Sequence, residues 1–272
     1  MRKILLLLFV ITSCSKGDNI ISDSEIDYLF EDGFETQENN LTELFPNDGS
    51  RWTNIQQVNP DNGESKIEIE SNTVFEGVNS LRVYAKASDN TLSKADIEQG
   101  GFNAPEGSTV RIEANFFIAS TENIENLLLV DLECCSCWDP SIPNNQCPGI
   151  RLMMKSNDFL SIERGKMLGS TIFQTDIAFP RNEWVNIIWE MKLSQNNDGI
   201  NKLLINKQEV ISEISMNMPN ANLFEAEFAK NGIDFKLQQP LFYERFQIGA
   251  TANPTQYEIE IFVDGVKLEI RE

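Results

Sequence analysis

Apolar and polar residues alternate along most of this chain, which is the pattern of β-strands with one buried face. In residues 80–87, Leu81, Val83 and Ala85 fall on one face and polar residues on the other. Residues 109–120 repeat the pattern over a longer stretch, with five apolar residues on one face: Val110, Ile112, Ala114, Phe116 and Ile118. Both segments are therefore predicted to be strands.

Other segments show how the strands are connected. Residues 125–134 are nearly all apolar, which predicts a central strand covered on both faces. Asn157 and Asp158 suit a tight turn between two strands, and the Asn-Asp-Gly sequence at 197–199 marks another turn between the segments 183–194 and 201–211.

Only residues 221–230 read as a helix, because Pro219 precedes them and Gly232 follows them. Many short strands, separated by turns and not divided by a linker or a repeat, predict one all-β domain over residues 28–272. The expected architecture is a two-sheet antiparallel β-sandwich or jelly roll with one short helix.

The N-terminus has the layout of a secretory signal: Arg2 and Lys3, a short apolar stretch, and small residues before Cys14. The sequence ITSC resembles the lipobox of bacterial lipoproteins, and the following CSKGDN resembles the tether of Bacteroidetes surface lipoproteins. The resemblance implies a signal peptide at 1–13, lipidation of Cys14 and a tether at 14–27. We therefore expect an outer membrane lipoprotein that faces the cell exterior and is held to the membrane by its lipid.

Composition excludes several classes of function. The formal charge is −20, and it becomes −22 after loss of Arg2 and Lys3. Such a charge repels phosphate backbones and argues against nucleic acid binding. The chain contains no histidine, which excludes Ser-His-Asp and Cys-His catalysis and removes the usual nitrogen ligand of transition metals.

Four cysteines remain after Cys14, and all lie between residues 134 and 147: Cys134, Cys135, Cys137 and Cys147. Outside the cytoplasm an even number of cysteines predicts disulfides, although three pairings are open. A bond between the adjacent Cys134 and Cys135 is disfavoured by strain. A four-thiolate zinc site and a redox centre are the alternatives, but the spacing does not match paired C-x-x-C zinc knuckles.

Three segments suggest a family. Residues 183–210 look like the late hairpin of concanavalin A-like lectin/glucanase jelly rolls. The closing residues 259–270 resemble the last strand of that superfamily, and residues 30–35 with 75–85 resemble its opening. The resemblance specifies an architecture that hosts lectins, hydrolases, lyases and binding modules.

The main functional expectation is binding of extracellular carbohydrate rather than catalysis. Sugars dock on exposed aromatic rings with polar groups around them. The candidate residues are Trp138, Trp52, Tyr84 and Tyr243. Trp184 and Trp189 are expected to pack in the core. A structural or adhesive surface protein without a glycan ligand is a further alternative.

The enzymatic alternative is a polysaccharide lyase that acts on uronate-containing glycans. A retaining glycosidase is disfavoured because Asp131 and Glu133 lack the third carboxylate of the usual motif. Without histidine, a lyase would need a tyrosine for proton transfer and a cation beside it. The candidate catalytic residues are Tyr243, Arg151 and Lys94, the last within SKADIEQGG.

No cofactor is required for these functions, but related sandwiches hold a calcium ion that joins the two ends of the chain. The resemblance implies oxygen ligands from Glu31, Asp32 or Glu35 together with Asp264.

Overall fold

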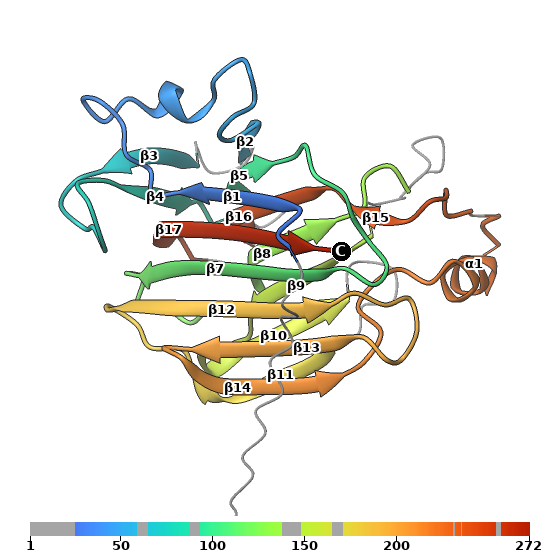
Figure 1. Ribbon diagram of the computed structural model, residues 1–272. Helices are drawn as coiled ribbons and strands as arrows, with labels where there is room; N and C mark the ends of the chain where they lie inside the picture. The colour runs from blue at the N-terminus through green and yellow to red at the C-terminus, as the bar shows by residue number, and fades with distance from the viewer. Residues whose placement is uncertain are drawn as a thin grey trace, which may run out of the picture.

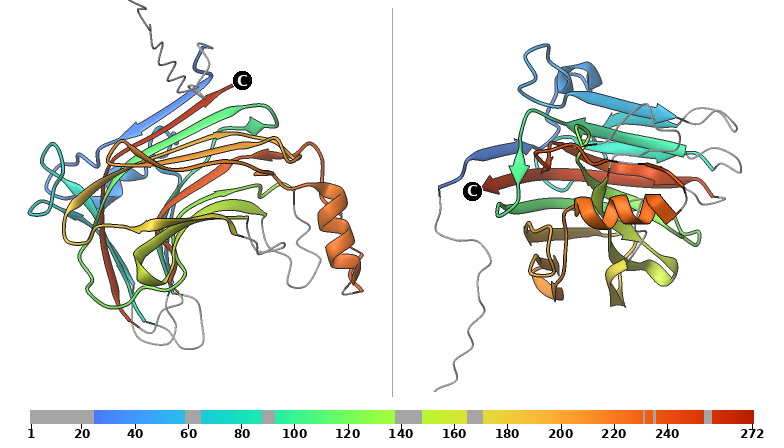
Figure 2. Two further views of the ribbon diagram at one scale, coloured as in Figure 1. Left: turned by 90° about the horizontal axis from the view of Figure 1, so that it is seen from below. Right: turned by 90° about the vertical axis from the view of Figure 1, so that its right-hand side faces the viewer.

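The computed structural model describes residues 25–58, 65–87, 93–137, 148–164, 171–230, 232–234, 236–253 and 257–272. The signal, Cys14, Trp138 and Cys147 lie outside these residues. The described chain forms two large antiparallel sheets stacked as layers, which confirms the predicted β-sandwich (Figures 1 and 2).

The eight-stranded sheet faces the viewer in Figure 1. Its strands, in spatial order, are β14 (Gln208–Ile214), β13 (Ile200–Ile205), β12 (Trp184–Lys192), β7 (Thr109–Ile118), β17 (Ile259–Arg271), β4 (Ser80–Ala85) and β3 (Lys66–Glu70), with β1 (Tyr28–Asp32) paired to β17. The first half of β17 pairs with β4 and the second half with β1, and a register shift between Asp264 and Lys267 separates the halves.

The seven-stranded sheet lies behind it. Its order is β11 (Thr171–Ala178), β10 (Phe159–Arg164), β9 (Gly149–Met154), β8 (Leu127–Glu133), β16 (Arg245–Asn253), β5 (Ser93–Gln99) and β2 (Asn54–Val58). The remaining elements are a two-stranded pair of β15 (Phe242–Tyr243) and β6 (Ala104–Pro105), two 3-10 turns (Leu41–Leu44 and Ser156–Asp158), and α1 (Ala221–Lys230) at one end of the sandwich.

The core fills the space between the two sheets because each strand turns alternate apolar side chains inward. The predicted inner faces of β4 and β7 are buried, and β8 is a central strand whose seven residues are all buried. Asn157 and Asp158 both have φ of 61°, as a tight β9–β10 turn requires. Trp189 is fully buried, as expected, whereas Trp184 is not in the core: it is half-buried and packs against Phe117 and Phe75 on the outer face of its sheet.

Within the described residues, no helix has both the length and the apolarity needed to cross a membrane. The helix α1 matches the predicted residues 221–230, and its buried Phe224 fixes it to the core.

Candidate active site on the seven-stranded sheet

The outer face of the seven-stranded sheet carries mainly charged and amide side chains. Strand alternation places them there, because the residues between them, such as Ile97, Leu132 and Phe246, point into the core. We call this surface the polar face and define it by Lys94, Asp96, Glu98, Asp131, Glu133, Arg151, Lys155, Glu163, Arg245 and Gln247.

Strand register brings these side chains into rows across the sheet. One row crosses five strands, from β5 to β10, and consists of Glu98, Gln247, Asp131, Arg151 and Glu163. A neighbouring row pairs Arg245 with Glu133. Residues far apart in the sequence thus become direct neighbours, as with Glu98 and Gln247, which are 149 positions apart.

Two arginines share the carboxylate of Glu133. Arg151 donates from Nε to Asp131 Oδ2 at 2.8 Å and from Nη2 to Glu133 Oε1 at 3.4 Å. Arg245 donates from Nε to Glu133 Oε2 at 2.9 Å. Burial by itself would lower the pKa of both guanidinium groups, but the attraction of the carboxylates outweighs it and raises each pKa. Both arginines therefore stay charged.

Asp96 differs from the other carboxylates on this face. It is fully buried, and neither of its side-chain oxygens accepts a hydrogen bond from a residue that the structure describes. Burial, reinforced by the charges of Glu98, Asp131 and Glu133, raises its pKa to about 8, although Lys94 offsets part of the rise. Asp96 is therefore mostly protonated at neutral pH.

Asp96 pairs across the sheet with Gly249 on β16. A Cβ on Gly249 would lie 2.7 Å from the Ala95 carbonyl oxygen and 3.2 Å from Asp96 Cα. Glycine at this position lets the backbones of β16 and β5 approach closely.

The charges of the polar face balance when Asp96 is protonated. Four carboxylates, Glu98, Asp131, Glu133 and Glu163, then stand beside four cations, Lys94, Arg151, Lys155 and Arg245. Glu163 also forms an ion pair with Lys155 at 3.1 Å. The described part of this face is thus close to neutral although the whole chain has a charge of −20.

Sequence comparison identifies the family of the chain. The family model described as polysaccharide lyase matches residues 46–267, which include every strand of the polar face. The chain belongs to this polysaccharide lyase family.

Solved structures agree in fold. An endo-β-1,4-glucuronan lyase from the fungus Trichoderma reesei is 11% identical with a TM-score of 0.62, covering 88% of this chain and 94% of that one. The cellulose induced protein Cip1 is 12% identical with a TM-score of 0.53, covering 88% and 96%. The alginate lyase vAL-1 from Chlorella virus is 12% identical with a TM-score of 0.51, covering 90% and 99%. A search of curated proteins found no match.

In this member of the lyase family, two of the three catalytic candidates predicted from the sequence lie on the polar face. Lys94 shares a face of β5 with Asp96 and Glu98, and Arg151 lies on β9. Tyr243 is not on this face: it is buried on β15, and its hydroxyl donates to the Asn217 carbonyl oxygen at 2.6 Å. Burial, reinforced by the charge of nearby Asp131 and partly offset by Arg151, raises the pKa of Tyr243, so this phenol is unsuited to accept a proton from substrate.

The aromatic candidates for sugar binding are not gathered on one surface. Trp52, expected to be exposed, is fully buried and stacks between Phe34 and Phe246 with centroid distances of 5.9 and 6.1 Å. The buried Tyr243 is likewise unavailable to a sugar. Tyr84 lies on the eight-stranded sheet, where its hydroxyl donates to Glu258.

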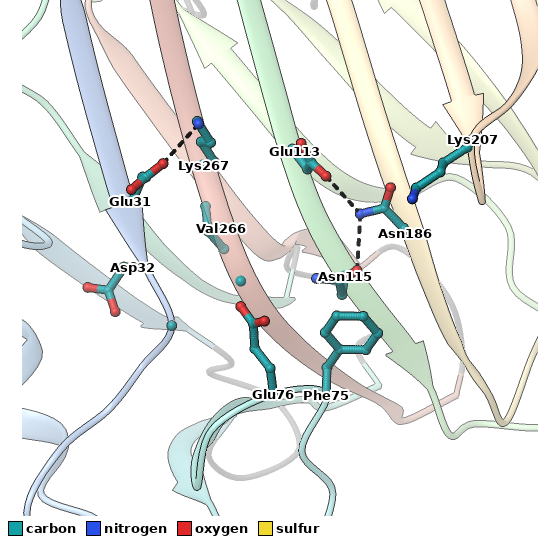
Figure 3. Close-up of a pocket in the computed structure, with 12 residues that line it drawn as sticks. Glu31, Asp32, Phe75, Glu76, Glu113, Asn115, Asn186, Lys207, Val266 and Lys267 are labelled. Atoms are coloured by element: carbon teal, nitrogen blue, oxygen red, sulfur yellow. Dashed lines mark hydrogen bonds and ion pairs between the residues drawn. The ribbon is translucent and has the colours of Figure 1, made fainter.

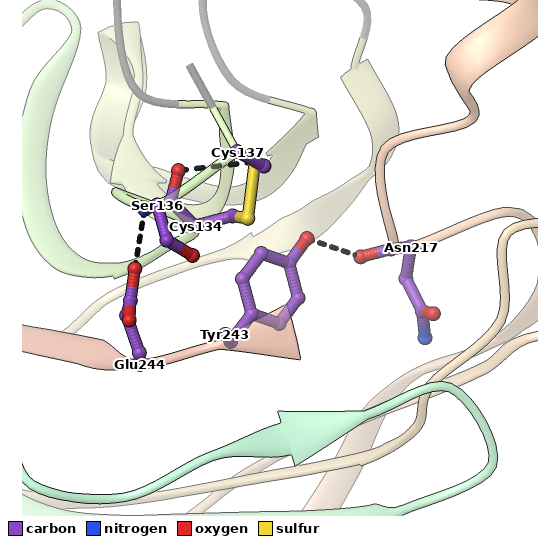
Figure 4. Close-up of a disulfide and its surroundings, with 6 residues drawn as sticks. All are labelled: Cys134, Ser136, Cys137, Asn217, Tyr243 and Glu244. Atoms are coloured by element: carbon purple, nitrogen blue, oxygen red, sulfur yellow. Dashed lines mark hydrogen bonds between the residues drawn. A yellow bond between two sulfur atoms is a disulfide. The ribbon is translucent and has the colours of Figure 1, made fainter. Parts of the chain in front are cut away.

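A disulfide joins Cys134 to Cys137 directly after β8, the strand that carries Asp131 and Glu133 (Figure 4). The surrounding backbone is tied down on both sides: Cys134 N donates to the Pro148 carbonyl oxygen at 2.8 Å, and Ser136 N donates to the Glu244 carboxylate. Cys135 is half-buried. The bridge therefore fixes the chain where it leaves Glu133.

The four proposed calcium ligands are not brought together. Asp32 pairs with Arg51 at 2.7 Å and Glu31 with Lys267 at 2.9 Å, while Glu35 accepts from Val78 N at 2.8 Å. Asp264 is buried and accepts three backbone N–H groups. In the described ranges, no three histidine, cysteine or acidic residues form a group that could hold a metal ion.

Sequence reasoning missed Asp96, Glu98, Arg245 and Gln247 as site residues. Their signal was present, because SKADIEQ and ERFQIGA both alternate polar with apolar residues. What the sequence did not show is that these two segments pair with each other.

Proposed function

We propose that this protein is a polysaccharide lyase that cleaves a uronate-containing glycan bound along the polar face. The observation that carries the proposal is the family match over residues 46–267 combined with a face of charged side chains from five of its strands. The proposal is also supported by the glucuronan lyase and the alginate lyase that share its fold, both of which are named for uronate polymers.

The reaction requires three acts. A cation neutralises the uronate carboxylate, a base removes the proton on the adjacent carbon, and the bond to the neighbouring sugar oxygen breaks as a carbon–carbon double bond forms. The leaving oxygen then takes up a proton, so cleavage consumes no water and no cofactor.

Arg245 is the proposed partner of the uronate carboxylate. Its side chain is 31% exposed, whereas that of Arg151 is 7% exposed and held between Asp131 and Glu133. A planar guanidinium also suits two-point binding of a carboxylate.

Asp96 is the proposed proton-transfer group. No donor among the described residues bonds to its oxygens, and it pairs with Gly249 of β16, the strand that also carries Arg245 four positions earlier. Because a base must be ionised, activity is expected to rise with pH toward a plateau above a midpoint near pH 8, the pKa of Asp96.

The test follows the ultraviolet absorbance of the unsaturated uronate product on glucuronan, alginate and heparin. We expect activity on at least one polymer, and a loss of at least about 100-fold in Asp96→Asn and in Arg245→Gln. Two control variants should keep their activity per folded molecule: Lys230→Gln on α1, whose side chain is 70% exposed, and Tyr243→Phe. Full activity in Asp96→Asn would remove the proposed base.

A second candidate function is glycan binding without cleavage. It is favoured by the absence of histidine from the chain and of tyrosine from the polar face as the described residues define it. Retention on a uronate polymer without any ultraviolet-absorbing product would identify this function.

We also propose that Cys14 carries lipid and that the protein faces the exterior at the outer membrane. The proposal is supported by the lipobox-like ITSC and the short apolar stretch before it. A structural calcium ion is a separate proposal that rests on the family resemblance alone.

A further inference from the structure

A cavity lies on the outer surface of the eight-stranded sheet, the layer opposite the polar face (Figure 3). Its volume is about 570 Å³, within the usual range for small-molecule sites. Side chains from several strands and from the loop before β4 line it, among them Phe75, Glu113, Asn115, Asn186, Lys207 and Lys267.

One wall of the cavity is an aromatic ring held in place. Phe75 is 48% exposed and packs against Trp184 with a centroid distance of 5.8 Å. The backbone beneath it is fixed, because the Asp264 carboxylate accepts from Phe75 N at 2.9 Å and from Glu76 N at 3.1 Å. The ring is thus presented at the rim without a large ordering cost on binding.

The floor offers amide groups. Asn186 Nδ2 donates to Asn115 Oδ1 at 3.1 Å and to Glu113 Oε1 at 3.3 Å, which fixes the orientation of the amide. Asn186 Oδ1 is buried and has no hydrogen-bond partner within the described part of the chain. A buried acceptor of this kind is costly unless a donor such as a ligand hydroxyl satisfies it.

A glycine keeps the cavity open at the bulge of β17. Gly265 has φ of +56°, and a Cβ there would lie 2.9 Å from Asn115 Nδ2 and 3.2 Å from Glu76 Oε1. A side chain at this position would press on the floor and on the wall.

The charges of the lining select the class of ligand. Four carboxylates line the cavity, Glu31, Asp32, Glu76 and Glu113, against two lysines. Three of these carboxylates are compensated, because Glu31 pairs with Lys267, Asp32 with Arg51 and Glu113 with Arg111. The lining therefore has no strong net charge, and its carboxylate and amide groups beside an aromatic ring suit the hydroxyls of an uncharged sugar.

We propose that this cavity is a second, non-catalytic binding site for a neutral glycan. It would hold an uncharged hexose chain with one sugar ring against Phe75 and its hydroxyls on Asn186 and Glu113. The site lies on the opposite layer from the polar face, so one molecule has room for both kinds of glycan. The inference does not depend on lyase activity.

The test is calorimetric titration of the intact protein with cellohexaose, mannohexaose and laminarihexaose, and with an alginate hexasaccharide for comparison. At least one neutral hexasaccharide should bind, and Phe75→Ala and Asn186→Ala should each weaken it at least about tenfold. Phe75→Trp should retain binding because it preserves an aromatic ring. Val78→Ala, on the same loop and 65% exposed, is the matched control and should bind as the wild type does.

Three results would overturn the inference: no binding of any neutral hexasaccharide, neutral binding that both cavity variants leave intact, or uronate binding that Phe75→Ala abolishes. The first two results do not bear on eliminative cleavage, because the neutral probes contain no uronate, and the third concerns binding at Phe75 and is measured without following cleavage. Failure here is therefore distinguishable from failure of the proposed lyase function.

Discussion

Arg151 and Asp96 show two ways in which the polar face accommodates a buried ionisable group. Arg151 keeps its charge because Asp131 and Glu133 surround it, with Nε and Nη2 in hydrogen bonds to both. Asp96 has no such donor and instead keeps its proton, since burial raises its pKa to about 8. One group stays charged within its ion pairs, and the other is held neutral by its burial.

Replacement of Arg151 by methionine should destabilise the protein by about 3–5 kcal/mol, because buried Asp131 loses its cation and Glu133 loses one of its two. The matched control is Arg82→Met, which removes a 32% exposed arginine that also pairs with two carboxylates, Glu68 and Glu260. That change should cost at most about 1 kcal/mol. Urea unfolding at neutral pH measures both, and equal losses would contradict the role of burial.

Asp96 should also make stability depend on pH. The folded pKa of about 8 is raised above the ordinary 3.8, so between these values the unfolded chain releases a proton that the folded chain retains. The free energy of unfolding therefore falls as pH rises through this window. Asp96→Asn should lose less stability than the wild type between about pH 5 and about pH 8 in urea unfolding. Parallel losses in the two proteins would mean that Asp96 is ionised in the fold.

At the scale of elements, most strands could be predicted from the sequence and the polar face could not. Alternation in 80–85 and 109–118, the turn at Asn157–Asp158 and the helix at 221–230 are local patterns, and the structure confirms them. The pairing of β5 with β16 depends on contacts between segments about 150 residues apart, which periodicity does not encode.

The predictions that Trp52 and Tyr243 are available to bind a sugar were wrong for a related reason. Trp52 lies in a polar stretch, yet Phe30, Phe34 and Phe246 from distant segments close around it. Tyr243 also appeared available, but β15 turns it inward toward Asn217. Local polarity does not report burial when the covering residues come from elsewhere in the chain.

The element scale also carries a prediction about the cysteines. Because Cys134 is joined to Cys137, only Cys135 and Cys147 remain as a second pair in the mature cluster. We expect a Cys135–Cys147 disulfide, closing a loop of about a dozen residues that contributes roughly 3 kcal/mol by chain entropy. Peptide mapping by mass spectrometry without reductant should find this linkage, and zinc bound to free thiols would exclude it.

At the scale of the whole molecule, two sheets expose two different surfaces. The seven-stranded sheet presents a nearly balanced set of charges around Asp96, and the eight-stranded sheet presents a cavity with an aromatic wall and a lining of amides and paired carboxylates. A lipid anchor on Cys14 would place both surfaces beside a membrane and within reach of extracellular polymers.

The anchor is tested by metabolic labelling with radioactive palmitate. The wild type should incorporate label and partition with membranes, while Cys14→Ala should do neither, because the acyl chains are attached through that sulfur. Equal labelling of the two proteins would exclude Cys14 as the site of lipidation.

The central claim is that a uronate glycan binds along the seven-stranded sheet with Asp96 at the reacting sugar. The most direct measurement is a crystal structure of Asp96→Asn with a uronate oligosaccharide from the polymer that the wild type cleaves. The account predicts sugar density across β5, β16 and β8, with a uronate carboxylate on Arg245 and the adjacent carbon facing residue 96. Density confined to the eight-stranded sheet, or a reacting sugar remote from residue 96, would contradict it.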